Sequence, residues 1–193
     1  MSVKSNQDYM RLAVSVAAAN RPGAFYGSAQ DLAPGTGLFF SDVPYPAYDI
    51  EAHRFRVYQG SVYVLTHECD IDQDNERPFN DLAVVCPVMR LEDLVEEYKA
   101  AGHEDKLYNL VQDIALDRIQ RVFYLPPPHD LFEVEMLRGG AILYLNNLVS
   151  THVSLLPPTA AQCALSEGAL RQLDAKLQNH LFRPKSDSLP QLA

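Results

Sequence analysis

The order of strand-forming and helical segments limits what this chain can fold into more than any other feature of the sequence. Runs rich in β-branched and aromatic residues, which are typical of strands, cover residues 53–59, 61–69, 82–89, 120–125, 131–137 and 141–149. Gly60 joins the first two runs, and shorter candidates lie at 38–40 and 152–156. Most of the stretch 23–46 is rich in Gly, Pro and aromatic residues without a clear period, which predicts irregular structure.

Apolar residues at helical spacing mark the expected helices. An N-terminal helix is expected at 6–20, and two more at 91–98 and 107–114, with Gly102 between them. A last helix carries an apolar stripe of Leu170, Leu173, Leu177 and Leu181. Strands on both sides of an inserted helical hairpin predict an α+β fold. We expect a small, mostly antiparallel barrel or curled sheet with N- and C-terminal helices.

The length of 193 residues suits a single domain with a substantial core. We expect one α+β domain over residues 1–184 and a flexible C-terminal tail over residues 185–193. Hydrophobic residues make up 47% of the chain and charged residues 21%, which is the usual mixture for a globular protein and argues against a disordered chain.

Charge and cysteine content restrict the partners and the compartment. The formal charge of −9 makes attraction to phosphate backbones unfavourable, so nucleic acid is not the expected partner. The three cysteines, Cys69, Cys86 and Cys163, form no disulfide framework, which favours a reducing compartment and a cytoplasmic location. The apolar stretch 12–19 is too short to span a membrane and lacks the features of a signal peptide, so no membrane association is expected.

One segment carries most of the residues that can do chemistry. The run THECDIDQDNERPFND, residues 66–81, places one thiol, one imidazole and six carboxylates where a strand gives way to a loop. We expect His67, Cys69 and Asp70, at the end of that strand, to form part of a ligand-binding pocket. The simplest alternative is structural: Cys69 is a small buried hydrophobe, and the aspartates satisfy the backbone of a turn.

The spacing of the aspartates also fits a cation-binding loop. Asp70, Asp72 and Asp74 occupy positions 1, 3 and 5 of a twelve-residue loop, and Asp81 occupies position 12. Ca²⁺ or Mg²⁺ is the ion that such oxygen ligands would hold. The loop departs from the usual pattern because Asn75 replaces the glycine of position 6 and an Asp replaces the final Glu.

Two further hypotheses use the thiols. His67 and Cys69 lie on one face of the strand, and Cys86 joins them if the two strands pair in a register whose residue numbers add to an odd value. Such a group suits a transition metal, although no paired cysteine motif supports it. Alternatively Cys69 acts as a nucleophile with His67 or His152 as its base.

The run VYVLTHECDI carries a resemblance to known proteins. A hydrophobic strand that ends in Ser or Thr, two variable residues and Cys-Asp-Ile is found at 64–71, and related segments follow at 121–126 and 145–148. This pattern is similar to a group of uncharacterised bacterial proteins and covers about half of the chain, from 59 to 156. The resemblance implies a small β-barrel-like domain of bacterial origin, from a phage-defence or mobile-element locus, without an established activity.

No complete catalytic set is visible in the sequence, and exposed acidic and proline-rich loops suit binding. The leading hypothesis is therefore a noncatalytic binding or regulatory module of a bacterial system, with a protein as its partner and no cofactor. The competing hypothesis is a divalent-metal-assisted hydrolase or nuclease that uses the acidic loop from Asp70 to Asp81 to hold an ion that activates water.

Overall fold

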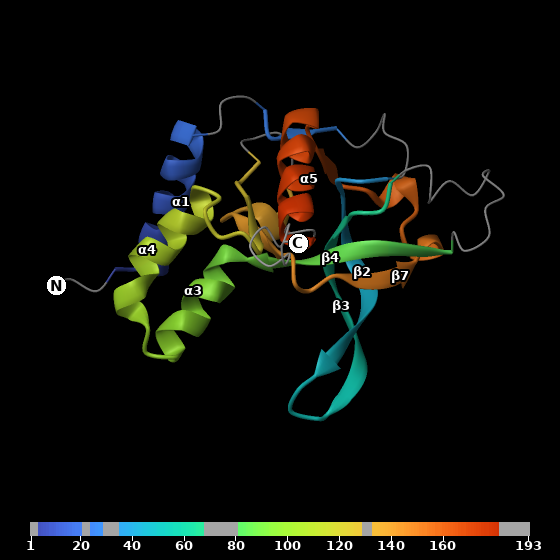
Figure 1. Ribbon diagram of the computed structural model, residues 1–193, viewed down its shortest axis with the longest axis horizontal. Coiled ribbons are helices and arrows are strands. Elements are labelled where there is room, and N and C mark those ends of the chain that lie inside the picture. The colour runs from blue at the N-terminus through green and yellow to red at the C-terminus, as the bar shows by residue number, and fades with distance from the viewer. Residues whose placement is uncertain (1–3, 21–23, 29–34, 68–80, 129–132, 182–193) are drawn as a thin grey trace, which may run out of the picture.

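The computed structural model describes residues 4–20, 24–28, 35–67, 81–128 and 133–181, and these form helices against one curled sheet (Figure 1). The helices are α1 (Asn6–Asn20), α3 (Leu91–Ala100), α4 (Glu104–Ala115) and α5 (Glu167–Leu181). The strands are β1 (Tyr26–Gly27), β2 (Leu38–Asp49), β3 (Arg54–Val64), β4 (Leu82–Arg90), β5 (Val122–Leu125), β6 (Ala141–Tyr144), β7 (Val149–His152) and β8 (Cys163–Leu165). Three short 3-10 helices are also present: η1 (Glu135–Leu137), η2 (Val153–Leu155) and η3 (Pro158–Ala160).

The sheet is antiparallel throughout, and β4 lies near its centre. The strand order is β1-β8-β2-β3-β4-β6-β5, and β7 also pairs with β4. Val85 of β4 pairs with Val64 of β3 and with Val149 of β7, so β7 lies on the side of β4 away from β3. The end strands β1 and β5 do not pair with each other in the described part of the chain. The expected α+β fold with a curled sheet is therefore confirmed, and the sheet does not close into a barrel.

Both faces of the sheet are buried at its centre, because alternate residues of β2 and β3 enter two different cores. Phe39 and Tyr63 pack in one core with the inner side of α5, where Leu173 is fully buried. Phe40 and Val62, on the opposite face, pack in another. Because both faces are buried here, the inner parts of β2 and β3 are continuous runs of apolar residues in the sequence.

A separate helical layer covers the β5–β6 end of the sheet (Figure 1). Helices α1, α3 and α4 enclose a third core, which they share with Val122, Tyr124 and Ile142 of the sheet. The α3–α4 hairpin is inserted between β4 and β5, as the sequence predicts. No helix in the described ranges is both long and apolar enough to cross a bilayer.

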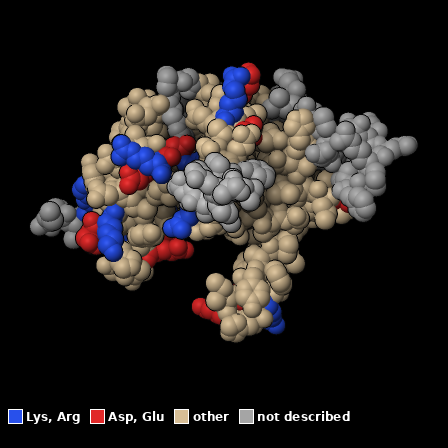
Figure 2. Space-filling view, viewed as in Figure 1, with Lys and Arg blue, Asp and Glu red and all other residues tan. Residues whose placement is uncertain are grey.

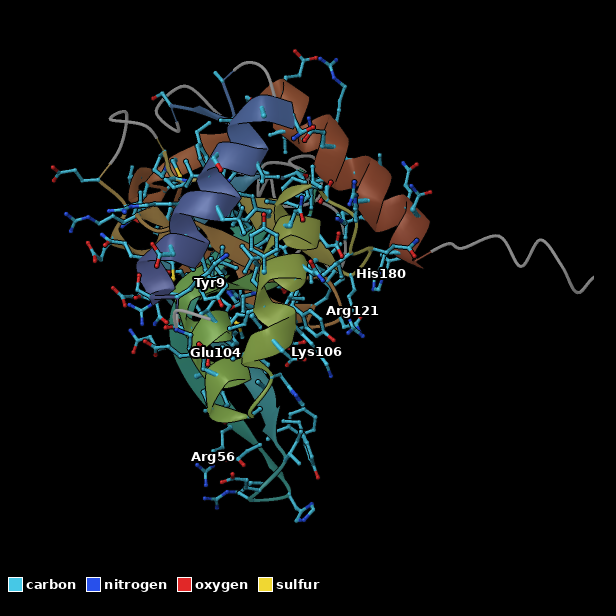
Figure 3. All side chains as sticks on the ribbon, turned by 90° about the vertical axis from the view of Figure 1, so that its left-hand side faces the viewer. Tyr9, Arg56, Glu104, Lys106, Arg121 and His180 are labelled. Carbon is cyan, nitrogen blue, oxygen red and sulfur yellow. The ribbon has the colours of Figure 1, made fainter. Side chains whose placement is uncertain are left out.

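A long β-hairpin projects from this body. Strands β2 and β3 pair from Phe39 and Tyr63 in the core out to Asp49 and Arg54 beside the turn at 50–53. The outer half, residues 44–59, is called the arm below, and it extends away from the rest of the molecule in Figures 1 and 3.

The expectation of irregular structure up to residue 46 was wrong, because β2 runs from Leu38 to Asp49. Pro44 and Pro46 are tolerated because their backbone nitrogens point away from β3; the carbonyl of Pro44 accepts a hydrogen bond from Thr151 Oγ1 at 2.9 Å. The expected break at Gly60 was also wrong. Gly60 lies inside β3, opposite Val43, where the register shifts at a β-bulge.

Four other strand expectations need correction. The run 61–69 ends as strand at Val64, and residues 68 and 69 lie outside the described ranges. The run 131–137 contains the turn η1, and 152–156 contains η2. The run 141–149 is divided into β6 and β7, because the register with β4 changes between them. The strands β1 and β8 were not predicted, since two or three residues give no measurable alternation.

Gly140 tests how tightly the sheet packs beneath the helical layer. It has a φ of +84°, its carbonyl accepts a hydrogen bond from Leu91 N, and an added Cβ would lie 2.7 Å from Tyr124 Oη. We expect Gly140→Ala to lower the free energy of unfolding by about 2–4 kcal/mol, because backbone strain and overpacking add. Gly102→Ala is the matched control, with a φ of +76° and no atom near the new Cβ. Urea unfolding that gives equal losses for both variants would contradict this packing.

Candidate functional site

Most of the acidic segment lies outside the described residues. Cys69, Asp70, Asp72 and Asp74 fall in the range 68–80, so the predicted ligand pocket and the cation loop remain predictions. Its flanks are described: His67 and Asp81 are both exposed, and the Asp81 carbonyl accepts a hydrogen bond from Val153 N at 2.9 Å. Among the described residues, no group of three or more His, Cys, Asp or Glu side chains is placed to hold a metal ion.

The hypothesis that joined Cys86 to His67 depends on the register of β3 and β4. Cys86 pairs with Tyr63, so the residue numbers add to an odd value, as that hypothesis requires. The same register, continued, places His67 opposite Leu82, four residues from Cys86. Cys86 is fully buried and His67 is exposed, so these two side chains do not form a shared site.

The two described thiols are part of the core. Cys86 donates to the Tyr144 carbonyl at 3.5 Å, and burial raises the pKa of its thiol to about 12. Burial also raises the pKa of Cys163 to about 11, and its sulfur lies 3.8 Å from Tyr63 Oη. Neither thiol is available as a nucleophile at neutral pH, because the thiolate is the reactive form.

His152, the other expected base, has a structural role. Its Nδ1 lies 2.8 Å from Ser154 Oγ and accepts a hydrogen bond from Ser154 N at 3.2 Å. It thereby caps η2 at the end of β7.

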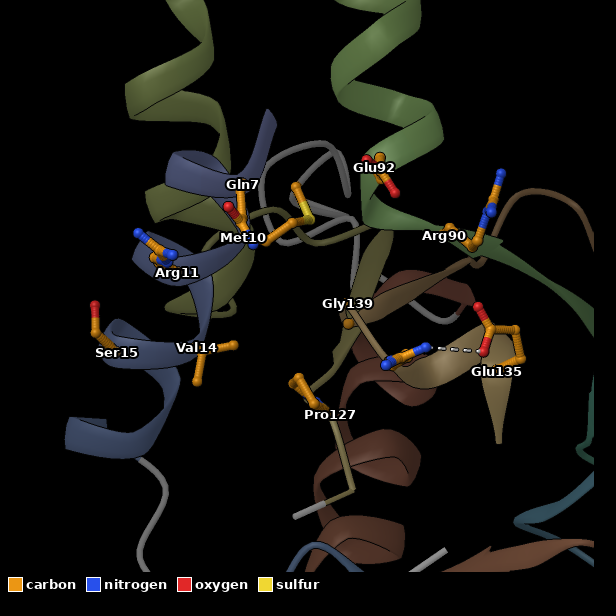
Figure 4. A pocket seen from close by; sticks show the side chains of 12 residues that line it. Gln7, Met10, Arg11, Val14, Ser15, Arg90, Glu92, Pro127, Glu135 and Gly139 are labelled. Atoms are coloured by element: carbon orange, nitrogen blue, oxygen red, sulfur yellow. Dashed lines mark ion pairs between the residues drawn. The ribbon is translucent and has the colours of Figure 1, made fainter. Parts of the chain in front are cut away.

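A cavity of about 630 Å³ lies between α1 and the turn that leads into β6 (Figure 4). Three of its charged residues are paired: Arg90 Nη2 lies 2.5 Å from Asp93 Oδ1, and Arg138 Nη1 forms an ion pair with Glu135 Oε2 at 3.7 Å. Ser15, its hydroxyl-bearing residue, donates to the Leu12 carbonyl within its own helix. The described residues that line the cavity therefore include no activated nucleophile and no converging set of acids.

The arm is the most unusual surface in the described part of the molecule. Large apolar side chains that stand in solvent are concentrated on it: Tyr48 is 51% exposed, Ile50 76%, Phe55 74% and Val57 75%. Single exposed apolar residues are normal on soluble proteins, but contiguous groups of them mark interaction sites.

The register divides the arm into two faces. Tyr48 is opposite Phe55, and Pro46 is opposite Val57, so these four residues share one face, called the apolar face. The Tyr48 and Phe55 rings meet edge to face, with centroids 5.3 Å apart. Tyr48, Phe55 and Val57 are each at least half exposed, so this face is open among the described residues.

The opposite face holds the hairpin in shape. Arg56 Nε lies 2.9 Å from Asp49 Oδ2, and the Tyr45 and Tyr58 rings stack with centroids 6.4 Å apart. Partial burial raises the pKa of Tyr45. Cross-strand pairs of this kind contribute roughly 0.2–1 kcal/mol each, so this face stabilises the arm and leaves the apolar face free for contact.

The charges on the arm are few and nearly balanced. Residues 44–59 contain two acids, Asp49 and Glu51, and two arginines, Arg54 and Arg56. Figure 2 shows the arm mostly in the colour of uncharged residues, with its charges near the tip. This balance suits contact with a protein surface better than contact with a polyanion.

Sequence reasoning missed this surface, although a signal was present. Residues 54–57 alternate between charged and apolar side chains, as Arg-Phe-Arg-Val, which is the two-residue period of a strand with one apolar face. The partner strand β2 was not predicted over this range, because Pro44 and Pro46 are unusual inside a strand.

Searches against protein-family models, curated proteins and solved structures found no match to this chain.

Burial of the thiols gives a direct test of the core. We expect Cys86 and Cys163 to resist alkylation at pH 8 in the native protein, because at that pH only about one part in 10³ to 10⁴ of each is thiolate and neither is accessible. The measurement is mass spectrometry after timed iodoacetamide treatment, with a Cys69→Ser variant so that only these two thiols are counted. Both should react once urea unfolds the chain; rapid native reaction at either position would contradict the buried assignment.

Proposed function

We propose that this protein is a noncatalytic binding module that docks onto a partner protein through the apolar face of its arm. The observation that carries the proposal is the exposure of Phe55 and Val57, about three quarters each, side by side on a projecting hairpin. Burial of such side chains stabilises a complex by roughly 1.5–3 kcal/mol each.

The chemistry of the arm supports a protein as the partner. Aromatic residues are enriched at the energetic centres of protein interfaces, and Tyr48 and Phe55 already stand in fixed mutual contact. A preformed hairpin loses little conformational entropy on binding, which favours affinity. The matching surface is an apolar groove about as wide as one hairpin.

The described ionisable groups support binding more than catalysis. Two of the cavity arginines, Arg90 and Arg138, pair with neighbouring acids, and the thiols of Cys86 and Cys163 are protonated core groups. Two protonated buried thiols also suit a reducing compartment, so we place the module in the cytoplasm. From the sequence pattern at 64–71 we extend the proposal to a regulatory role in a bacterial phage-defence or mobile-element system.

A photo-crosslinking experiment tests the proposed surface. We expect benzoylphenylalanine at position 55 to form an adduct with a partner protein in the source cells. The same label at Tyr108, which is 43% exposed on α4, is expected to form none. Tyr48→Ser should weaken the adduct at position 55 by about tenfold or more, since one anchor side chain of an interface is worth about 1–3 kcal/mol.

Fold stability is the control for that experiment, because Tyr48 is exposed and its replacement removes one cross-strand ring pair, which should change the free energy of unfolding by less than about 1 kcal/mol. Equal crosslinking from positions 55 and 108, or an adduct unaffected by Tyr48→Ser, would remove the arm from the function.

A further inference from the structure

The two edges of the arm differ in what they offer to another strand. On β2, Pro44 and Pro46 face outward and lack N–H groups, so that edge cannot form a regular ladder. No proline interrupts β3. Natural sheets often use proline to block strand addition, and here the block is present on one edge alone.

Hydrogen bonds at the base of β3 show which of its backbone groups face its outer edge. The Val64 carbonyl accepts from Gly37 N on the β2 side, whereas Leu65 N donates to the Val84 carbonyl on the β4 side. Because direction alternates along a strand, the odd-numbered residues Phe55, Val57 and Gln59 direct their N–H and C=O groups to the β4 side. The described pairing with β4 covers only residues 62–64, so these groups lie on an open edge among the described residues.

We propose that a second copy of this chain occupies that edge, with the two β3 strands antiparallel and a two-fold axis through Val57. In this register Val57 pairs with its own equivalent, and Phe55 pairs with Gln59 of the other copy. All three outward residues of each copy then exchange hydrogen bonds. A two-fold interface uses the same patch on both molecules, which an edge symmetric about Val57 provides.

Charge selects this register over its neighbours. On the polar face it places Arg56 opposite Tyr58 of the other copy, where the guanidinium can lie against the ring. A shift by two residues toward the tip places Arg56 directly opposite itself, and like charges in that position are destabilising. A shift toward the body requires Ser61, which lies beside the residues already paired with β4. The near balance of charge on the arm lets two arms meet although each chain carries −9.

Pairing would join the two hairpins into one four-stranded platform. The apolar faces of both copies then lie on the same side of the platform and double the area that a partner can cover. This consequence rests on the proposed function, whereas the pairing itself does not.

Two cysteine variants test the geometry, both in a Cys69→Ser background. Val57→Cys places two thiols on the two-fold axis at a Cα separation of about 5.5 Å, within the range of a disulfide. Phe55→Cys is the matched control, because it has the same exposure on the same face, but its equivalents would lie about 13 Å apart along the strands. We expect mild oxidation to link Val57→Cys dimers at least about tenfold faster than Phe55→Cys dimers.

Sedimentation equilibrium tests the association without a new thiol. We expect the wild-type chain and Val57→Thr to form dimers, and Val57→Pro, which removes the central N–H, to sediment as a monomer. A wild-type chain that stays monomeric up to its solubility limit, or equal crosslinking of the two cysteine variants, would overturn the pairing.

These results are separable from the proposed function. A monomeric wild-type chain whose position 55 still crosslinks to a partner protein would sink the pairing and leave the binding role standing. A dimer that forms while position 55 crosslinks to no partner protein would support the pairing and contradict the proposed binding role.

Discussion

The antiparallel ladder between β2 and β3 is the interaction on which the rest of the structure depends. Its inner half carries Phe39 and Tyr63 into one core and Phe40 and Val62 into another, so it fixes the centre of the sheet from both faces. Its outer half continues the same hydrogen bonding into solvent. The arm is thus an extension of the best-packed strands, and its root cannot shift without disturbing two cores. That anchorage allows a narrow hairpin to present side chains at fixed positions.

The two faces of the arm have different roles: one stabilises the hairpin, and the other presents apolar side chains to solvent. The Arg56–Asp49 ion pair and the Tyr45–Tyr58 stack hold the hairpin on one side, while Tyr48, Phe55 and Val57 remain exposed on the other. An isolated two-stranded hairpin is only marginally stable in water, and exposed apolar strands promote aggregation. A hairpin with no binding role would therefore be expected to carry polar residues on both faces. Prolines on β2 limit that risk on one edge. The apolar face beside the unblocked edge is the physical basis of the binding role that we propose for the arm.

Helices were predicted well from the sequence and strands were predicted less well, for identifiable reasons. The periodic stripes at Leu91 to Tyr98 and at Leu170 to Leu181 are long enough to define a helix, and both helices are present. Proline misled the prediction at Pro44 and Pro46, because a sequence does not show which way a backbone nitrogen faces. Gly60 was predicted to lie between two strands, but it lies inside β3 at a β-bulge. Glycine is favoured both in turns and at bulges, so the sequence alone does not distinguish them. The arm has a weak signal in the sequence, because the four-residue alternation at 54–57 is shared with ordinary surface strands.

Amide hydrogen exchange along β3, measured residue by residue by NMR in dilute protein, tests the central claim most directly. The claim is that the arm is a folded hairpin with one edge and one face open. We expect an alternation: the amides of Arg56 and Tyr58, which face β2, exchange slowly, and those of Phe55, Val57 and Gln59 exchange fast. Uniformly fast exchange across residues 54–59 would mean that the arm is not a stable hairpin, and uniform protection in dilute protein would mean that its outer edge is already covered within the chain. Either result would contradict the account.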